Sequence, residues 1–118
     1  MKYDVLVIGG YFLDFIFAEL EDSPGLGREV FSKQFFMLPG GSYNTVATLH
    51  RLGVKAAWAV KFGNDEFSQY VIKAAENDGL DASCFSYEKR PIRNITVSAS
   101  LQGCLLYTSD AADEEDSV

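Results

Sequence analysis

Two segments of the chain are almost continuously apolar over the length of a strand. Tyr3–Gly10 is such a run and ends in two glycines, and Lys55–Phe62 is the second. Runs of this kind are typical of strands that are buried on both faces, in a sheet flanked by helices. A third, shorter strand is predicted over Ser83–Tyr87.

Two helices are predicted between these strands. Ser42–Leu52 has helical periodicity, and Gly53 follows at the position where left-handed backbone is common. Asp65 is the predicted N-cap of a second helix, Glu66–Asn77, which Asp78-Gly79 closes. The apolar stripes consist of Val46, Leu49 and Leu52 in the first helix and of Phe67, Val71, Ala74 and Ala75 in the second. Strands that alternate with helices imply βαβ units, a mainly parallel sheet and an α/β fold.

Two further segments have a different pattern. In Asn94–Leu101 apolar residues alternate with polar ones, and Glu29–Leu38 is rich in phenylalanine and has strand character. Both suit a small antiparallel flap with one face in water. An apolar stretch that contains Asp14, Tyr11–Leu20, ends at the turn-rich segment Glu21–Gly27.

The composition of the chain is that of a globular protein. It has 118 residues, of which 47% are hydrophobic and 23% charged. This is short for a complete α/β enzyme, so one small domain or a fragment is expected. No apolar run is long enough to span a membrane, and no secretory signal is recognisable. Cys84 and Cys104 match neither a disulfide framework nor a metal spacing, so we expect reduced thiols in a cytoplasmic protein.

Most of the net charge of −7 lies in the tail. Residues 104–118 contain five acidic residues and no basic one, so residues 1–103 carry 12 acidic against 10 basic side chains. This part of the chain is therefore nearly neutral and has no basic face, so nucleic-acid binding is not predicted. The 11 residues Cys104–Glu114 resemble the translation of a sequencing-library adapter, which predicts that the protein proper is residues 1–103 and that the tail is artefactual. The alternative is an ordinary strand, Cys104–Thr108, that returns over Gln102-Gly103 and precedes an acidic disordered tail.

The candidate chemistry is that of a site for hydroxyl groups. Ligands of open α/β sheets bind beyond the carboxyl ends of the strands, and Asp14 follows the first strand. Its carboxylate would accept hydrogen bonds from adjacent hydroxyls, and the amide of Asn44 would donate and accept them. Gly40 and Gly41 would allow close approach of the backbone and supply amides at a helix start. Taken singly, Asp14 could equally be a cap or surface carboxylate, the glycines a tight turn, and Asn44 an exposed residue of the first turn.

In combination these motifs resemble a known family. Three motifs are similar to the N-terminal signature region of PfkB-type, ribokinase-like carbohydrate kinases. They are Gly9-Gly-Tyr-Phe-Leu-Asp14, Pro39-Gly-Gly-Ser-Tyr-Asn44 with Gly53 and Gly63 after it, and Phe62-Gly-Asn-Asp-Glu-Phe67. The resemblance covers roughly residues 3–103. Ser42 and Val46 stand where smaller or hydroxyl-bearing residues are usual, and Phe12 stands where ribokinase carries a sugar-contacting Asn. The last departure argues against ribose as the substrate.

The resemblance implies a three-layer α/β/α domain with a small β-sheet lid, here truncated. It implies that Asp14 and Asn44 bind substrate hydroxyls beside the backbone of Gly40 and Gly41, and that residues 29–38 and 94–101 belong to the lid. The parent protein would transfer the γ-phosphoryl group of ATP, with magnesium, to a carbohydrate hydroxyl. The family's C-terminal Gly-Ala-Gly-Asp motif supplies the base and the anion hole, and it does not occur in this sequence. The fragment alone is therefore expected to be inactive, with no catalytic residue of its own.

The resemblance also implies a homodimer formed through the lid. Phe35, Phe36 and Met37 would provide an apolar outer face, or would simply pack on the sheet below.

Three other functions are alternatives to the sugar kinase. A nucleoside kinase of the same superfamily fits the same motifs. A nicotinamide-binding module lacks its third glycine and would meet the bulky residues Tyr11–Leu13. A non-enzymatic α/β interaction domain would use Asp14 and Asn44 only structurally.

Overall fold

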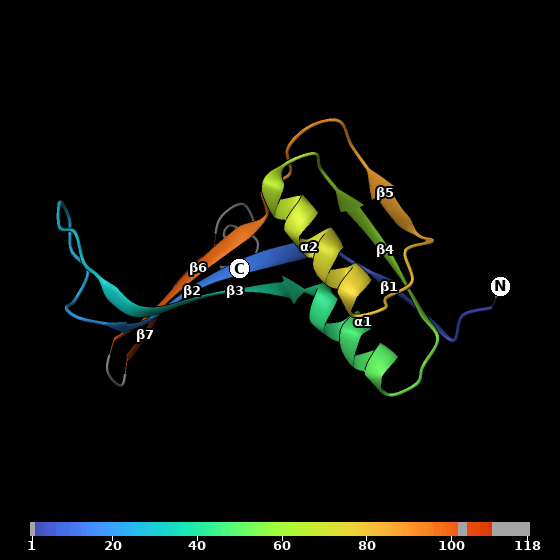
Figure 1. Cartoon of the computed structure of the whole chain (residues 1–118), viewed down its shortest axis with the longest axis horizontal. Helices are drawn as coiled ribbons and strands as arrows, with labels where there is room; N and C mark the ends of the chain where they lie inside the picture. The colour runs from blue at the N-terminus through green and yellow to red at the C-terminus, as the bar shows by residue number, and fades with distance from the viewer. Residues whose placement is uncertain (1, 102–103, 110–118) are drawn as a thin grey trace, which may run out of the picture. The chain divides into compact units, whose positions relative to one another are not determined.

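The computed structural model describes residues 2–101 and 104–109, the latter by their backbone (Figure 1). The chain divides into two compact units. The first comprises Met1–Leu13 and Pro39–Asn94, and the second comprises Asp14–Leu38 and Ile95–Val118. Within the described residues, no helix has the length and apolar character needed to cross a membrane.

The first unit is a parallel sheet with two helices. Its strands are β1 (Val5–Ile8), β4 (Ala56–Phe62) and β5 (Phe85–Tyr87), in the order β1-β4-β5, and its helices are α1 (Ser42–Arg51) and α2 (Glu66–Asn77). The register pairs Val7 with Trp58 and Val60 with Phe85. The predicted βαβ units and both predicted helices are therefore confirmed.

The ends of both helices follow the local signals in the sequence. After α1, Gly53 has a φ of 83°, a left-handed conformation that glycine adopts without steric cost. At the start of α2, the side chain of Asp65 accepts a hydrogen bond from the Ser68 amide at 3.1 Å. This is the predicted N-cap, and it satisfies one of the amides that a helix start leaves without a partner.

The core of this unit forms around Trp58, which is fully buried. Its ring meets Tyr43 of α1 edge-on at 5.7 Å and Phe62, further along β4, at 5.9 Å. On the same face, Tyr11 stacks on Phe62 at 5.2 Å and bonds through its hydroxyl to Ser68 of α2. Both helices therefore cover the face of the sheet that carries Trp58 and Phe62. Figure 1 shows α1 and α2 beside β4.

At β1 the opposite face of this sheet is not buried, contrary to the prediction for the first strand. Side chains alternate along a strand, so Leu6 and Ile8 point away from the face of Val7 and Trp58. Leu6 is 55% exposed and Ile8 76% exposed. The prediction of a strand buried on both faces was wrong for β1, because both helices lie on one face and β1 is the edge strand.

The second unit is built on a four-stranded sheet of order β3-β2-β6-β7. The strands are β2 (Tyr11–Leu20), β3 (Ser32–Gly41), β6 (Ile95–Leu101) and β7 (Cys104–Ser109). β6 and β7 are antiparallel, with Leu101 opposite Cys104, so the return strand that the composition permits is present. Strands near β3 and β6 were predicted from the sequence, but β2 was not, because its apolar stretch lacks the alternation that marks β6.

Two glycines of the first unit differ in why they must be glycine. A Cβ on Gly63, at the end of β4, would lie 2.4 Å from the carbonyl oxygen of Arg90 and 2.6 Å from the amide nitrogen of Ile92. A Cβ on Gly53 would meet nothing within 4 Å, so only its positive φ favours glycine at this position.

Gly63→Ala should therefore lower the free energy of unfolding by about 3 kcal/mol, because rigid backbone must move to make room. The matched change Gly53→Ala should cost only about 1 kcal/mol, through backbone conformation alone. Urea denaturation of the two variants measures the difference. Equal losses would show that the backbone contacts at Gly63 are not limiting.

Candidate functional site

The junction of β3 and α1 requires glycine at Gly41. This residue has a φ of 66°, and a Cβ there would lie 3.1 Å from the carbonyl oxygen of Gly10 and 2.9 Å from the ring of Phe12. Gly40, before it, is buried. The chain thus passes closely over the end of the first strand before it turns into α1, as the paired glycines of the motif predict.

The N-terminus of α1 is left open by this junction. Its N-cap is Gly41, so no side chain caps the helix, and its first turn carries no acidic residue. The amide of Ser42 donates to the carbonyl of Gly10 at 3.2 Å, and Asn44 is exposed in the first turn. Uncapped amides at a helix start are donors suited to hydroxyl or anionic oxygen atoms of a ligand. Gly40, Gly41 and Asn44 therefore lie together at the uncapped start of α1.

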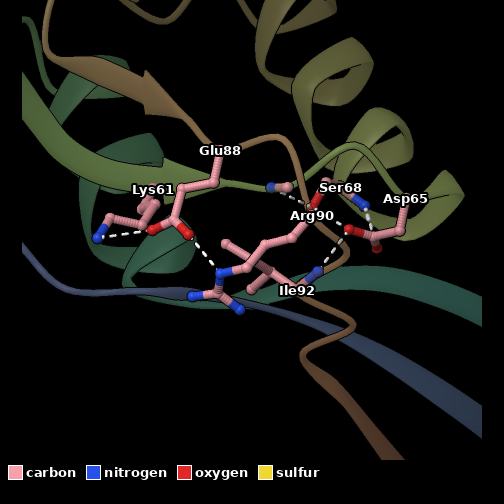
Figure 2. Close-up of polar contacts among 7 residues, drawn as sticks. Lys61, Asp65, Ser68, Glu88, Arg90 and Ile92 are labelled. Carbon is pink, nitrogen blue, oxygen red and sulfur yellow. Dashed lines mark hydrogen bonds and ion pairs between the residues drawn. The ribbon is translucent and has the colours of Figure 1, made fainter.

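The N-terminus of α2, in contrast, is closed by a buried network (Figure 2). Asp65 is 5% exposed. One of its carboxylate oxygens accepts from the amide of Ile92 at 2.8 Å and from the hydroxyl of Ser68 at 2.9 Å. The other accepts from the amide of Ser68. Asp65 therefore caps α2 and at the same time holds the loop that leads towards β6.

The hydroxyl of Ser68 uses its full hydrogen-bonding capacity in this network. It donates to Asp65, and it accepts from the amide of Gly63 at 2.9 Å. Its remaining lone pair faces the hydroxyl of Tyr11 at 2.6 Å, so Tyr11 must be the donor of that bond. Tyr11 directly follows Gly10, the residue that receives the α1 amide. The closed end of α2 and the open end of α1 are thus linked through two consecutive residues of one strand segment.

The pKa shifts of Asp65 and Tyr11 agree with these hydrogen bonds. Burial acts to raise the pKa of Asp65, but the hydrogen bonds from Ile92 and Ser68 outweigh it and hold this pKa below its usual range. Burial is the main cause that raises the pKa of Tyr11, and the negative charge of Asp65 adds to it. Asp65 is therefore ionised and Tyr11 neutral near pH 7, the states that the hydrogen bonds require.

The loop beside the network is held by backbone bonds and an ion cluster (Figure 2). The amide of Glu88 donates to the carbonyl of Phe62 at 2.8 Å, and the amide of Asn64 donates to the carbonyl of Arg90 at 3.0 Å. The carboxylate of Glu88 lies 2.8 Å from the ammonium of Lys61 and also bonds to Arg90. The Lys61 bond, followed by the Arg90 bond, lowers the pKa of Glu88.

Asp14 is the first residue of the second unit, within β2. It is half-buried, and one carboxylate oxygen accepts a hydrogen bond from the hydroxyl of Thr96 at 2.5 Å. Thr96 on β6 is itself buried. This bond fixes the carboxylate and leaves its second oxygen for another donor.

Three supporting residues were missed by the sequence analysis: Tyr11, Ser68 and Thr96. The Asp65-x-x-Ser68 spacing carried a signal for one of them, since an N-cap side chain reaches the third residue of its helix. Thr96 had no local signal, because its partner Asp14 is 82 positions away. Within residues 2–101, no three His, Cys, Asp or Glu side chains form a group that could hold a metal ion.

The charge of Asp65 should make the free energy of unfolding depend on pH. A carboxylate whose pKa is lowered by folding stabilises the fold above its unfolded pKa of about 4, and this contribution is lost as the pH falls through the folded value. Asp65→Asn should lower the free energy of unfolding by about 2 kcal/mol at pH 7, because three charge-assisted bonds are weakened. The deficit relative to the unaltered chain should shrink below about pH 4.

Glu66→Gln is the matched control for Asp65→Asn. It removes one negative charge from the exposed first turn of the same helix and should change stability by only a few tenths of a kcal/mol. Chemical denaturation at several pH values measures both variants. A deficit for Asp65→Asn that stays constant from pH 7 to pH 3 would contradict the role of its charge.

Comparisons with known proteins agree with this geometry. Residues 2–116 match the pfkB family of carbohydrate kinases. A 5-dehydro-2-deoxygluconokinase of Clostridium beijerinckii is 31% identical over 88 residues, which are 75% of this chain and 25% of that protein. The chain thus spans about a quarter of the length of the curated relative it matches.

Two solved structures illustrate the similarity of fold. The nucleoside kinase of Methanocaldococcus jannaschii has a TM-score of 0.72 at 18% identity, over 97% of this chain and 39% of that chain. A ribokinase of Cryptococcus neoformans, solved in complex with ADP, has a TM-score of 0.70 at 19% identity, over 91% of this chain and 34% of that chain. These similarities show the ribokinase-like α/β fold. Since the family match covers nearly the whole sequence, the chain belongs to the PfkB family of carbohydrate kinases.

Proposed function

We propose that this chain is the substrate-binding part of an ATP-dependent sugar kinase. The observation that carries the proposal is the open N-terminus of α1, which the glycine junction leaves without a side-chain cap. Asp14, Gly40, Gly41 and Asn44 are the residues proposed to bind the sugar. Asp14 accepts from hydroxyls through the oxygen that Thr96 does not use, and Asn44 and the first-turn amides of α1 supply donors.

In this proposal these residues position the sugar, and other residues carry out the phosphoryl transfer. In phosphoryl transfer the bond between the γ-phosphorus and the bridging oxygen of ATP breaks as the acceptor hydroxyl bonds to phosphorus and loses its proton to a base. Asp14 holds the acceptor and is not that base. The base and the anion hole belong to the Gly-Ala-Gly-Asp motif of longer family members, which does not occur in this sequence. ATP and magnesium are assigned to the parent protein with that motif.

The acceptor is proposed to be a sugar or a related polyhydroxy compound. Phe12 lies against the glycine junction and offers an apolar ring instead of a polar contact, which argues against ribose. The curated relative is named for 5-dehydro-2-deoxygluconate, a keto sugar acid, so this compound leads the substrates to be screened. A nucleoside belongs in the same screen, since a nucleoside kinase shares the fold.

In the kinase that contains this segment, Asp14→Ala should raise the KM for the sugar about 30-fold and leave the KM for ATP unchanged. The expected loss is about 2 kcal/mol, because hydrogen bonds to a charged group disappear. Steady-state kinetics with each substrate varied in turn measures the two constants. Asp22→Ala is the matched control, because it removes an exposed carboxylate that pairs only with Arg28 and Ser23 among the contacts described.

Two outcomes would count against this assignment. An unchanged sugar KM in Asp14→Ala would remove Asp14 from the site. A sugar titration followed by NMR separates the kinase from a non-enzymatic interaction domain. If the NMR signals of Asp14 and Asn44 show no sugar-dependent change in a protein that retains its fold, the proposed sugar site is wrong.

We also propose that the second unit forms a homodimer through the outer face of β3. Phe35 contacts Phe15 and Phe17, with ring centroids 6.0 and 5.0 Å apart, and is 49% exposed. Phe36 and Leu38 alternate with Phe35 on the other face and are 46% and 52% exposed. These two side chains offer the apolar contact.

Phe36→Lys should therefore convert the dimer to a monomer, because a charge would be placed in an apolar interface. Leu26→Lys is the control, since Leu26 is fully exposed in the turn region. Sedimentation equilibrium measures the mass of each. A monomeric unaltered chain, or a dimer that survives Phe36→Lys, would rule out this interface.

A further inference from the structure

A cavity of about 420 Å³ lies in the first unit, at the amino ends of β1 and β4. Its lining comes from the residues before these strands and from the turn after α2, and it includes Tyr3, Lys55 and Asp81. His50 lines it from the last turn of α1. The proposed sugar site lies at the other ends of β1 and α1, so this cavity is a separate feature of the unit.

The two helices end beside the cavity in the same way. Gly53 after α1 and Gly79 after α2 both line it, with φ values of 83° and 76°. The residue after each glycine donates its amide to the carbonyl five positions earlier, at 3.0 Å in both cases. These bonds are Schellman caps, which satisfy the last helical carbonyls within the backbone. Two walls of the cavity are therefore fixed by the chain itself.

The deeper part of the cavity is apolar. Val46 is 2% exposed and Leu80 is 9% exposed, and both line it. Tyr3 adds an aromatic ring, whose hydroxyl donates to the carboxylate of Asp81 at 3.1 Å. Sites for small molecules are typically cavities of this size, with an apolar lining and a few polar groups. The lining therefore suits a ligand with an apolar body.

The charges of the cavity favour an anion. Its charged lining residues are Lys2, Lys55 and Asp81. The carboxylate of Asp81 already accepts two hydrogen bonds, from the hydroxyl of Tyr3 and from the amide of Ser83 at 2.8 Å. Neither lysine pairs with a carboxylate within residues 2–101. Positive charge without a partner thus lies next to an apolar floor.

We propose that this cavity binds a small carboxylate with an apolar body. The body packs on Val46 and Leu80 beside the ring of Tyr3, and the carboxylate pairs with Lys2 and Lys55. Charge complementarity selects the anion over a neutral molecule of the same shape. The inference rests on neither the sugar site nor phosphoryl transfer, so a failed sugar titration would leave it standing.

Benzoate is the probe, and benzamide, which has the same ring and no charge, is its matched comparison. A titration of the 118-residue chain followed by NMR should shift the amide signals of Val46, His50 and Leu80 to saturation. Benzoate should bind about fivefold more tightly than benzamide at low ionic strength, the scale of exposed ion pairs, and salt should remove the difference. Equal affinities at low ionic strength, or shifts confined to residues outside the cavity, would overturn the proposal.

Two variants separate the charge from the shape of the site. Lys2→Gln with Lys55→Gln should lower the affinity for benzoate to that for benzamide and leave benzamide unaffected. Lys73→Gln is the matched control, because Lys73 is an exposed lysine of α2 that does not line the cavity.

Ala56→Leu adds volume inside the cavity and should abolish binding of both probes in a chain that keeps its fold. Benzoate binding of unchanged strength in the double lysine variant would contradict the proposed ion pairs. Binding of both probes that survives Ala56→Leu would place them elsewhere and exclude the cavity.

Discussion

The hydroxyl group of Ser68 is the point on which the arrangement of the first unit depends. It has one proton and two lone pairs, and all three are used, towards Asp65, Gly63 and Tyr11. These partners come from the start of α2, the end of β4 and the segment that leaves β1. Asp65 extends the network to the amide of Ile92. A buried polar network of this kind favours one arrangement of the segments that it joins, because any other leaves a donor or an acceptor without a partner.

The two helices of the unit begin in different ways. α2 begins with an aspartate that satisfies its own amides and holds a loop. α1 begins with a glycine whose positive φ and lack of Cβ let the backbone pass over Gly10, so no side chain caps it. One helix start is therefore part of the scaffold, and the other is the one proposed to bind the sugar. The proposed sugar site takes its rigidity from the first and its donors from the second.

The features that could be predicted from the sequence are those with local causes. The N-cap at Asp65 and the stop at Gly53 depend on residues within one helical turn, and both were predicted where the structure has them. The bond between Thr96 and Asp14 joins two strands far apart in the sequence, and no pattern indicated it. The apolar pattern of β1 predicted burial on both faces, which would require a layer that the described residues do not supply.

Membership of the PfkB family and the open helix end together support the central claim, that residues 1–103 are the sugar-binding part of a longer kinase. The most direct measurement is the sequence of the genomic locus across the codon for Gly103. The account predicts a reading frame that departs from the printed sequence at Cys104 and continues to a Gly-Ala-Gly-Asp motif. An uninterrupted frame that encodes Cys104 to Val118 and then stops would contradict it.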